Sequence, residues 1–176
     1  MMERKGIVEF NGRGVTVVGP DMQVGLPAPD FRVTSLDWEE FRALERTTGK
    51  LRVILSVLSL ETSVCDTETR RFNEEAAALG EDVVVMVVSA DLPFTQARWC
   101  GAAGIDRVMV VSDHAHTEFG INYGCLLKEL RFLRRAAFIV DQNDIVQYAA
   151  YMPELGQEPD YAEILGHARA LLGKSA

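Results

Sequence analysis

The sequence of 176 residues is poor in cysteine and has no long apolar segment and no excess of positive charge. Its three cysteines are too few for the disulfide scaffold of a small secreted domain. No apolar run approaches the roughly 18 residues that span a bilayer, so we expect no membrane segment. The charged start, residues 1–5, precedes no hydrophobic run and predicts no signal peptide. We therefore expect a cytoplasmic protein.

The charge balance excludes further classes of partner. A net charge of −8 at pH 7 argues against nucleic acid or an anionic membrane surface as the main partner. The apolar fraction of 48% and the charged fraction of 25% are ordinary for a globular protein. The length suits one hydrophobic core, and no repeat or linker interrupts the chain. We expect residues 1–176 to form a single domain.

Apolar runs and turn signals alternate along the chain in an α/β order. Residues 7–10 and 15–18 flank Asn11-Gly12, which predicts an N-terminal β-hairpin over about residues 6–19. Two nearly continuous apolar runs, residues 52–58 and 82–89, predict buried central strands. Helices are expected over residues 38–44, 62–79, 94–101 and 161–172, and further strands over residues 108–112, 135–141 and 145–149. This order predicts a mixed central sheet flanked by helices.

Cys65 stands where an apolar run gives way to a charged, helix-forming segment, in Thr62-Ser63-Val64-Cys65. A thiol in the first turn of a helix is placed to become a thiolate, because unpaired backbone N–H groups there favour negative charge. Cys100 follows in Arg98-Trp99-Cys100-Gly101. Since a second thiol could close a disulfide on the first, the pair indicates redox catalysis.

Simpler interpretations stand beside this one. A cysteine is often a small buried hydrophobe, and Cys65 or Cys100 could be inert in that way. Cys125 matches no motif, and we expect it to be structural. His114 and His116 could share one face of a strand, but no Cys-x-x-Cys and no suitably spaced third ligand accompany them. We expect solvated histidines and no metal.

The sequence resembles the thiol peroxidase group of atypical two-cysteine peroxiredoxins over nearly its whole length. A Thr-x-x-Cys step alone is weak evidence, whereas Ser-Ala-Asp-Leu-Pro-Phe followed by Cys-Gly-Ala is quite specific to this group. The segments that carry the resemblance are Thr62-Ser63-Val64-Cys65 with Arg71-Phe72-Asn73, then Ser89-Ala90-Asp91-Leu92-Pro93-Phe94, Cys100-Gly101-Ala102, and Arg135-Ala136 with Asp141-Gln142-Asn143-Asp144. The resemblance implies a thioredoxin-like fold.

The resemblance also implies roles for four residues. Cys65 matches the peroxidatic cysteine and Cys100 the resolving one, while Thr62 and Arg135 match positions that surround the reactive sulfur. It implies a homodimer without metal or bound organic cofactor, whose Cys65–Cys100 disulfide is reduced by a thioredoxin-type reductant. Judged from the residues alone, Thr62 could simply be an N-cap, and Arg135, next to Arg134, could belong to a solvated basic face.

One position departs from the pattern of the family. The signature Pro-x-x-x-Thr-x-x-Cys has Leu58 here in place of its proline. In the family that proline covers the thiolate and limits the access of water. Leu58 keeps an apolar cover but adds a backbone N–H and a more mobile side chain.

Splitting a peroxide requires a thiolate, donors that hold the peroxide, and stabilisation of the charge that develops on the leaving oxygen. A free thiol of pKa about 8.5 is only about 3% ionised at pH 7, and lowering the pKa to about 6 gains only about 30-fold in thiolate. Oriented donors must therefore contribute as well. We assign that role to Thr62, to backbone N–H groups near Cys65 and to Arg135.

We therefore expect a thioredoxin-dependent peroxidase that acts on hydrogen peroxide and alkyl hydroperoxides. One alternative is a peroxide-sensing redox switch or regulatory binding module that uses the same disulfide to change a partner surface. Another is a general disulfide oxidoreductase, against which the missing Cys-x-x-Cys argues.

Overall fold

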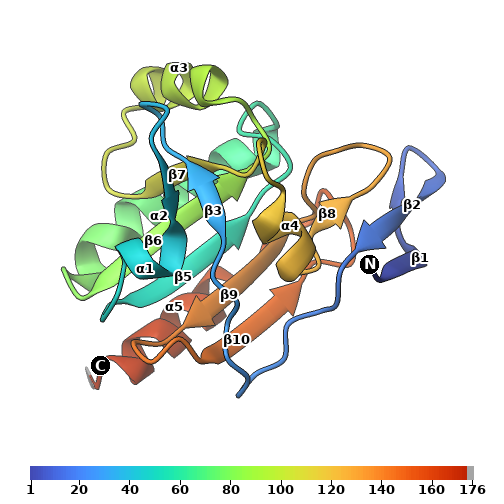
Figure 1. Cartoon of the computed structure of the whole chain (residues 1–176). Helices are drawn as coiled ribbons and strands as arrows, with labels where there is room; N and C mark the ends of the chain where they lie inside the picture. The colour runs from blue at the N-terminus through green and yellow to red at the C-terminus, as the bar shows by residue number, and fades with distance from the viewer. Residues whose placement is uncertain (174–176) are drawn as a thin grey trace.

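A computed structural model of the protein describes residues 1–173, which form a central mixed sheet with helices on both faces (Figure 1). The strand order of this sheet is β10-β9-β5-β6-β7-β3-β4, and a second, smaller sheet has the order β1-β2-β8. The strands are β1 (Glu3–Phe10), β2 (Arg13–Val18), β3 (Arg32–Thr34), β4 (Glu40–Arg42), β5 (Leu51–Ser56), β6 (Val83–Ser89), β7 (Met109–Ser112), β8 (Leu126–Leu127), β9 (Ala136–Val140) and β10 (Val146–Tyr151). The predicted mixed sheet and N-terminal hairpin are confirmed.

The central sheet separates the apolar core into two layers, and the helices cover its two faces. They are α1 (Ala43–Arg46), α2 (Ser63–Leu79), α3 (Pro93–Ala103), α4 (Glu118–Asn122) and α5 (Tyr161–Leu171). In Figure 1, α2 and α5 lie behind the sheet, whereas α1 and α4 lie in front of it. The core clusters agree: residues of α2, α3 and α5 pack together in one cluster, and residues of α1 and α4 pack in another.

Strand register brings distant segments to one edge of the sheet. Strand β5 is parallel to β6, so the loops that follow both strands leave from the same edge. Strand β9 is antiparallel to β5, and Ala136, its first residue, pairs with Ser56, the last residue of β5. Arg135 therefore lies beside the loop that connects β5 to α2.

The helix expected over residues 38–44 is wrong for most of its length. Trp38 has a φ of 65°, which a continuing right-handed helix does not allow. Residues 40–42 form β4, which pairs with β3, and the helix α1 is confined to Ala43–Arg46. Pairing at the sheet edge therefore overrides local propensity. The short elements α4 and β8 were not expected from the sequence.

No helix within residues 1–173 combines the length and the apolar composition needed to cross a membrane.

Candidate active site

Cys65 lies in the first turn of α2, and Thr62 caps that turn. The Thr62 Oγ accepts a hydrogen bond from the Cys65 backbone N–H at 3.3 Å, and the Thr62 hydroxyl donates to the Ser59 carbonyl at 3.1 Å. The simpler interpretation of Thr62, that of an N-cap, is thus confirmed. Because its proton is engaged by Ser59, Thr62 could donate to a substrate only after that bond breaks.

Arg135 reaches the sulfur of Cys65 from the start of β9. Its Nη2 donates to Cys65 Sγ at 3.2 Å and to the Leu155 carbonyl at 3.3 Å. Arg135 is 1% exposed and Cys65 is fully buried, so Arg135 does not belong to a solvated basic face. The guanidinium is permanently charged, so it presents a fixed cation and an oriented N–H donor to this sulfur.

Glu68 is a third buried side chain of this site. It follows Cys65 by one helical turn, is fully buried, and forms an ion pair with the Nη1 of Arg135. Its Oε1 has no hydrogen-bond partner among residues 1–173. Burial raises the pKa of the Glu68 carboxyl to about 7, and the charge of Glu158 adds to this, while Arg135 opposes it. From the sequence, Glu68 is only one of two acidic residues near the start of a helix.

The raised pKa of Glu68 predicts that stability decreases as the pH rises. The folded protein holds a proton on Glu68 that the unfolded chain releases near pH 4.5, so ionisation between pH 4.5 and about 7 costs folding free energy. We expect the free energy of unfolding of the wild type to fall over that window by up to about 3 kcal/mol relative to Glu68→Gln. Urea unfolding at pH 5, 6, 7 and 8 measures the difference.

Glu74, an exposed residue of the same helix, provides the matched control. Glu74→Gln should follow the wild type at every pH. If Glu68→Gln also follows the wild type, Glu68 does not titrate in this range.

The two other cysteines are buried free thiols. Cys100 lies in α3 at 6% exposure, and burial raises its pKa to about 11. Cys125 is fully buried, donates from Sγ to the Tyr123 carbonyl at 3.4 Å, and has its pKa raised by burial to about 12. Cys65 and Cys100 belong to the same apolar cluster, in which Leu58 is 9% exposed. All three thiols are unbonded, so the structure represents the reduced chain.

Asp91 joins the loop before Cys65 to the loop before α3. Its carboxylate accepts hydrogen bonds from the Ser59 hydroxyl at 2.7 Å, the Leu60 N–H at 2.9 Å and the Ser89 hydroxyl at 2.9 Å. The Asp-Leu-Pro-Phe segment is part of the family resemblance, but the sequence alone indicates no specific role for Asp91. Its contacts now show that it fixes the segment that carries Leu58.

Arg134 does not lie on a solvated basic face, which was one interpretation of the neighbouring arginines in the sequence. It is 2% exposed, donates to the Gly124 carbonyl at 2.7 Å, and pairs with Asp21. Its guanidinium also lies 3.9 Å from the centre of the Tyr151 ring. These partners provide the compensation that a buried charge requires.

The two histidines of the β7–α4 loop have separate partners. His114 Nδ1 lies 2.8 Å from Ser112 Oγ, and His116 Nε2 lies 3.1 Å from a carboxylate oxygen of Glu40. Within residues 1–173, no group of three or more His, Cys, Asp or Glu side chains is arranged to hold a metal ion.

Known proteins share this architecture and much of this sequence. Residues 23–165 match the Redoxin family. A thiol peroxidase of Bacillus subtilis (strain 168) is 48% identical over 165 residues, which cover 94% of this chain and 98% of the relative. A thiol peroxidase of Oceanobacillus iheyensis is 46% identical over 160 residues, which cover 91% and 96% of the two chains.

A solved structure of a peroxiredoxin-like protein from Aquifex aeolicus superposes with a TM-score of 0.85 at 38% identity, covering 95% of this chain and 98% of that one. The expected resemblance to thiol peroxidases and the thioredoxin-like peroxiredoxin fold are therefore confirmed. The extent of these matches leaves one conclusion: the chain belongs to the Redoxin family.

Proposed function

We propose that this protein is a thiol peroxidase that reduces hydrogen peroxide and alkyl hydroperoxides at Cys65. The observation that carries the proposal is the contact of 3.2 Å between the Arg135 guanidinium and the sulfur of Cys65 in the first turn of α2. A helix N-terminus and a buried cation are both placed to stabilise the negative charge that develops as a peroxide reacts at this sulfur. The names of the relatives point to the same activity and not to a regulatory module.

In the proposed first step, the Cys65 thiolate attacks one oxygen of the peroxide in line with the O–O bond. An S–O bond forms and the O–O bond breaks, which leaves a sulfenic acid on Cys65 and releases water or an alcohol once the leaving oxygen has gained a proton. The sulfur is oxidised by two electrons and the peroxide is reduced by two. Arg135 stabilises the charge on the leaving oxygen, since its Nη2 already faces the reacting sulfur.

In the second step, the Cys100 thiol attacks the sulfenic sulfur, and a disulfide forms with loss of water. A thioredoxin-type reductant then supplies two electrons and two protons, which restore both thiols. Burial raises the pKa of Cys100 to about 11, so Cys100 becomes a competent nucleophile only after it leaves its buried site.

Turnover with a reductant tests the function. With thioredoxin, thioredoxin reductase and NADPH present, we expect the wild type to consume many equivalents of peroxide. Cys100→Ser should consume its first equivalent at the wild-type rate and then stall, because no disulfide forms for the reductant to open. A wild type that also stalls after one equivalent would be a sensor and not an enzyme.

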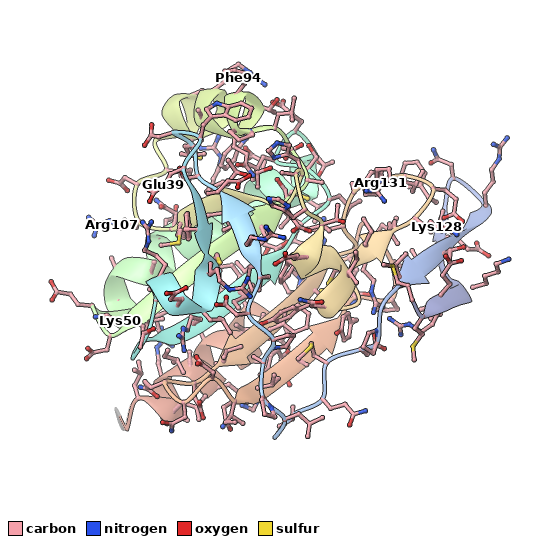
Figure 2. The ribbon with its side chains drawn as sticks, in the orientation of Figure 1. Glu39, Lys50, Phe94, Arg107, Lys128 and Arg131 are labelled. Carbon is pink, nitrogen blue, oxygen red and sulfur yellow. The ribbon has the colours of Figure 1, made fainter. Side chains whose placement is uncertain are left out.

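The remaining partners and the location belong to the same proposal. We place the protein in the cytoplasm, without nucleic acid as a partner, and expect a homodimer. Exposed apolar side chains support an interface of this kind: Leu92 and Phe94 at the start of α3, and Trp38, whose ring centre lies 4.8 Å from that of Phe94. Figure 2 shows Phe94 at the outer side of α3. Light scattering should give twice the chain mass of 19.5 kDa, and a monomer at micromolar concentration would contradict the dimer.

A further inference from the structure

The two helices that carry the cysteines are joined by a hydrogen bond between the residues next to each cysteine in the sequence. Asp66 follows Cys65 in α2, and Trp99 precedes Cys100 in α3. The indole Nε1 of Trp99 donates to Asp66 Oδ1 at 3.0 Å, and Trp99 is only 7% exposed. A hydrogen bond to a charged acceptor is stronger than a neutral one. Asp66 and Trp99 are thus hydrogen-bonded to each other, whereas the two cysteines next to them form no disulfide.

Arg70 reinforces this connection from the surface. Its Nε donates to Asp66 Oδ2 at 2.9 Å, and its Nη1 donates to the Ala103 carbonyl at the end of α3 at 3.2 Å. The guanidinium also lies 5.6 Å from the centre of the Trp99 ring, within the range of a cation–π contact. We call Asp66, Arg70 and Trp99 together the latch.

Closing a Cys65–Cys100 disulfide requires these helix segments to move. A disulfide holds its sulfurs about 2.05 Å apart and its Cα atoms within about 7 Å. Both thiols are unbonded and buried inside helices in the structure. Because Asp66 and Trp99 are adjacent in sequence to the two cysteines, unwinding either helix at its cysteine displaces one partner of the Asp66–Trp99 hydrogen bond.

We propose that the latch is a positioning device that sets how fast Cys100 resolves the sulfenic acid of Cys65. This inference rests on the proposed peroxidase function. In the resolving step the S–O bond of the sulfenic acid breaks, the S–S bond forms, and the hydroxyl leaves as water with the proton of Cys100. No external electrons are required.

A second peroxide competes for the same sulfenic acid and oxidises it to sulfinic acid. A tighter latch therefore makes Cys65 more sensitive to excess peroxide.

Two substitutions weaken the latch in different ways. Trp99→Phe removes the indole donor and keeps an aromatic ring in the core. Arg70→Met removes the contacts with Asp66, Ala103 and the indole, and it changes a side chain that is 46% exposed, so it leaves the core intact. We expect disulfide formation to accelerate about ten-fold in Trp99→Phe and about five-fold in Arg70→Met.

The matched control is Arg71→Met. Arg71 is the next residue on the same helix, is 53% exposed, and pairs with Glu75 at 3.2 Å as an i,i+4 neighbour, without an observed contact to α3. Removing this pair should leave the rate of disulfide formation within about two-fold of the wild type, because an exposed ion pair contributes little.

Rapid-quench mass spectrometry separates the steps. Reduced protein is mixed with one equivalent of hydrogen peroxide and quenched with an alkylating agent, and the species with one added oxygen and with two lost hydrogens are followed over time. The latch variants should gain the oxygen at the wild-type rate and lose the hydrogens faster. At higher peroxide they should accumulate less sulfinic acid by the same factor. General loosening of the fold would instead disturb the contact between Arg135 and Cys65 and slow the gain of oxygen.

The outcomes distinguish this inference from the function on which it rests. If the wild type gains no oxygen at Cys65, the peroxidase proposal fails. If sulfenic acid and disulfide both form but Trp99→Phe and Arg70→Met resolve no faster than Arg71→Met, the latch inference alone is overturned. Slower resolution in either variant would overturn it as well, since it would mean that these contacts assist closure of the disulfide.

Discussion

Replacement of Cys65 by serine should reduce the rate of peroxide consumption by about 10³-fold or more, to the background of the buffer. A serine hydroxyl is not ionised at neutral pH, and no histidine, the usual general base for serine, is among its observed contacts in the structure. Arg135 and the first turn of α2 would remain in place, but they would face an oxygen that is a poor nucleophile. Stopped-flow measurement of hydrogen peroxide loss, with thioredoxin in excess, determines the ratio of rates.

Cys125→Ser is the matched control for this experiment. Burial raises the pKa of Cys125 to about 12, which keeps it a thiol at neutral pH and therefore unreactive. The control should retain full activity. If Cys65→Ser keeps substantial activity while Cys125→Ser loses it, the nucleophile has been misassigned.

Replacement of Arg135 by lysine should lower kcat/KM for hydrogen peroxide by about 100-fold, close to 3 kcal/mol of transition-state stabilisation. Lysine keeps the positive charge, so any loss reflects the geometry of the donors. The guanidinium of Arg135 holds Glu68 with one nitrogen and faces Cys65 and the Leu155 carbonyl with another. A single ammonium on a flexible stem cannot occupy these positions together.

Arg131→Lys makes the same chemical change at an exposed position on the loop before β9, which is labelled in Figure 2. It should leave kcat/KM unchanged within about two-fold. The rate of the first turnover in a stopped-flow instrument provides the comparison, because it does not depend on the reductant. An Arg135→Lys variant that reacts like Arg131→Lys would show that charge near the sulfur suffices and that donor geometry does not matter.

Local signals in the sequence account for one half of this site. The hydroxyl residue Thr62, the acidic first turn and Gly80 at the end mark a helix over residues 62–79, and α2 follows it nearly to the residue. These signals alone predict the thiol of Cys65 at a helix N-terminus. The same kind of signal failed over residues 38–44, where strand pairing with β3 determines the outcome.

The other half of the site depends on long-range register. Arg135 meets Cys65 because Ala136 pairs with Ser56, and nothing local in the sequence specifies that register. Glu68 was missed for a related reason, since an acidic residue on a helix is usually solvated and here the partner that explains its burial comes from β9. The one signal in the sequence was the position of Glu68 one helical turn after Cys65. That position indicates a role in the site only when Arg135 is known to lie beside both residues.

Leu58 takes on a clearer meaning in the structure. It is 9% exposed and shares an apolar cluster with Cys65, which agrees with the expected role as a cover. The next two residues are held by Asp91, so the segment gains from hydrogen bonds part of the rigidity that a proline would supply. This arrangement explains how leucine can occupy the position of the signature proline while the loop keeps its place.

The most direct test of the account is disulfide mapping of the reduced protein before and after one equivalent of hydrogen peroxide. We predict a loss of two hydrogens per chain, located by peptide analysis to a bond between Cys65 and Cys100 of the same chain. A bond from Cys65 to Cys125, or a bridge between two chains, would contradict the assignment of Cys100 as the resolving thiol.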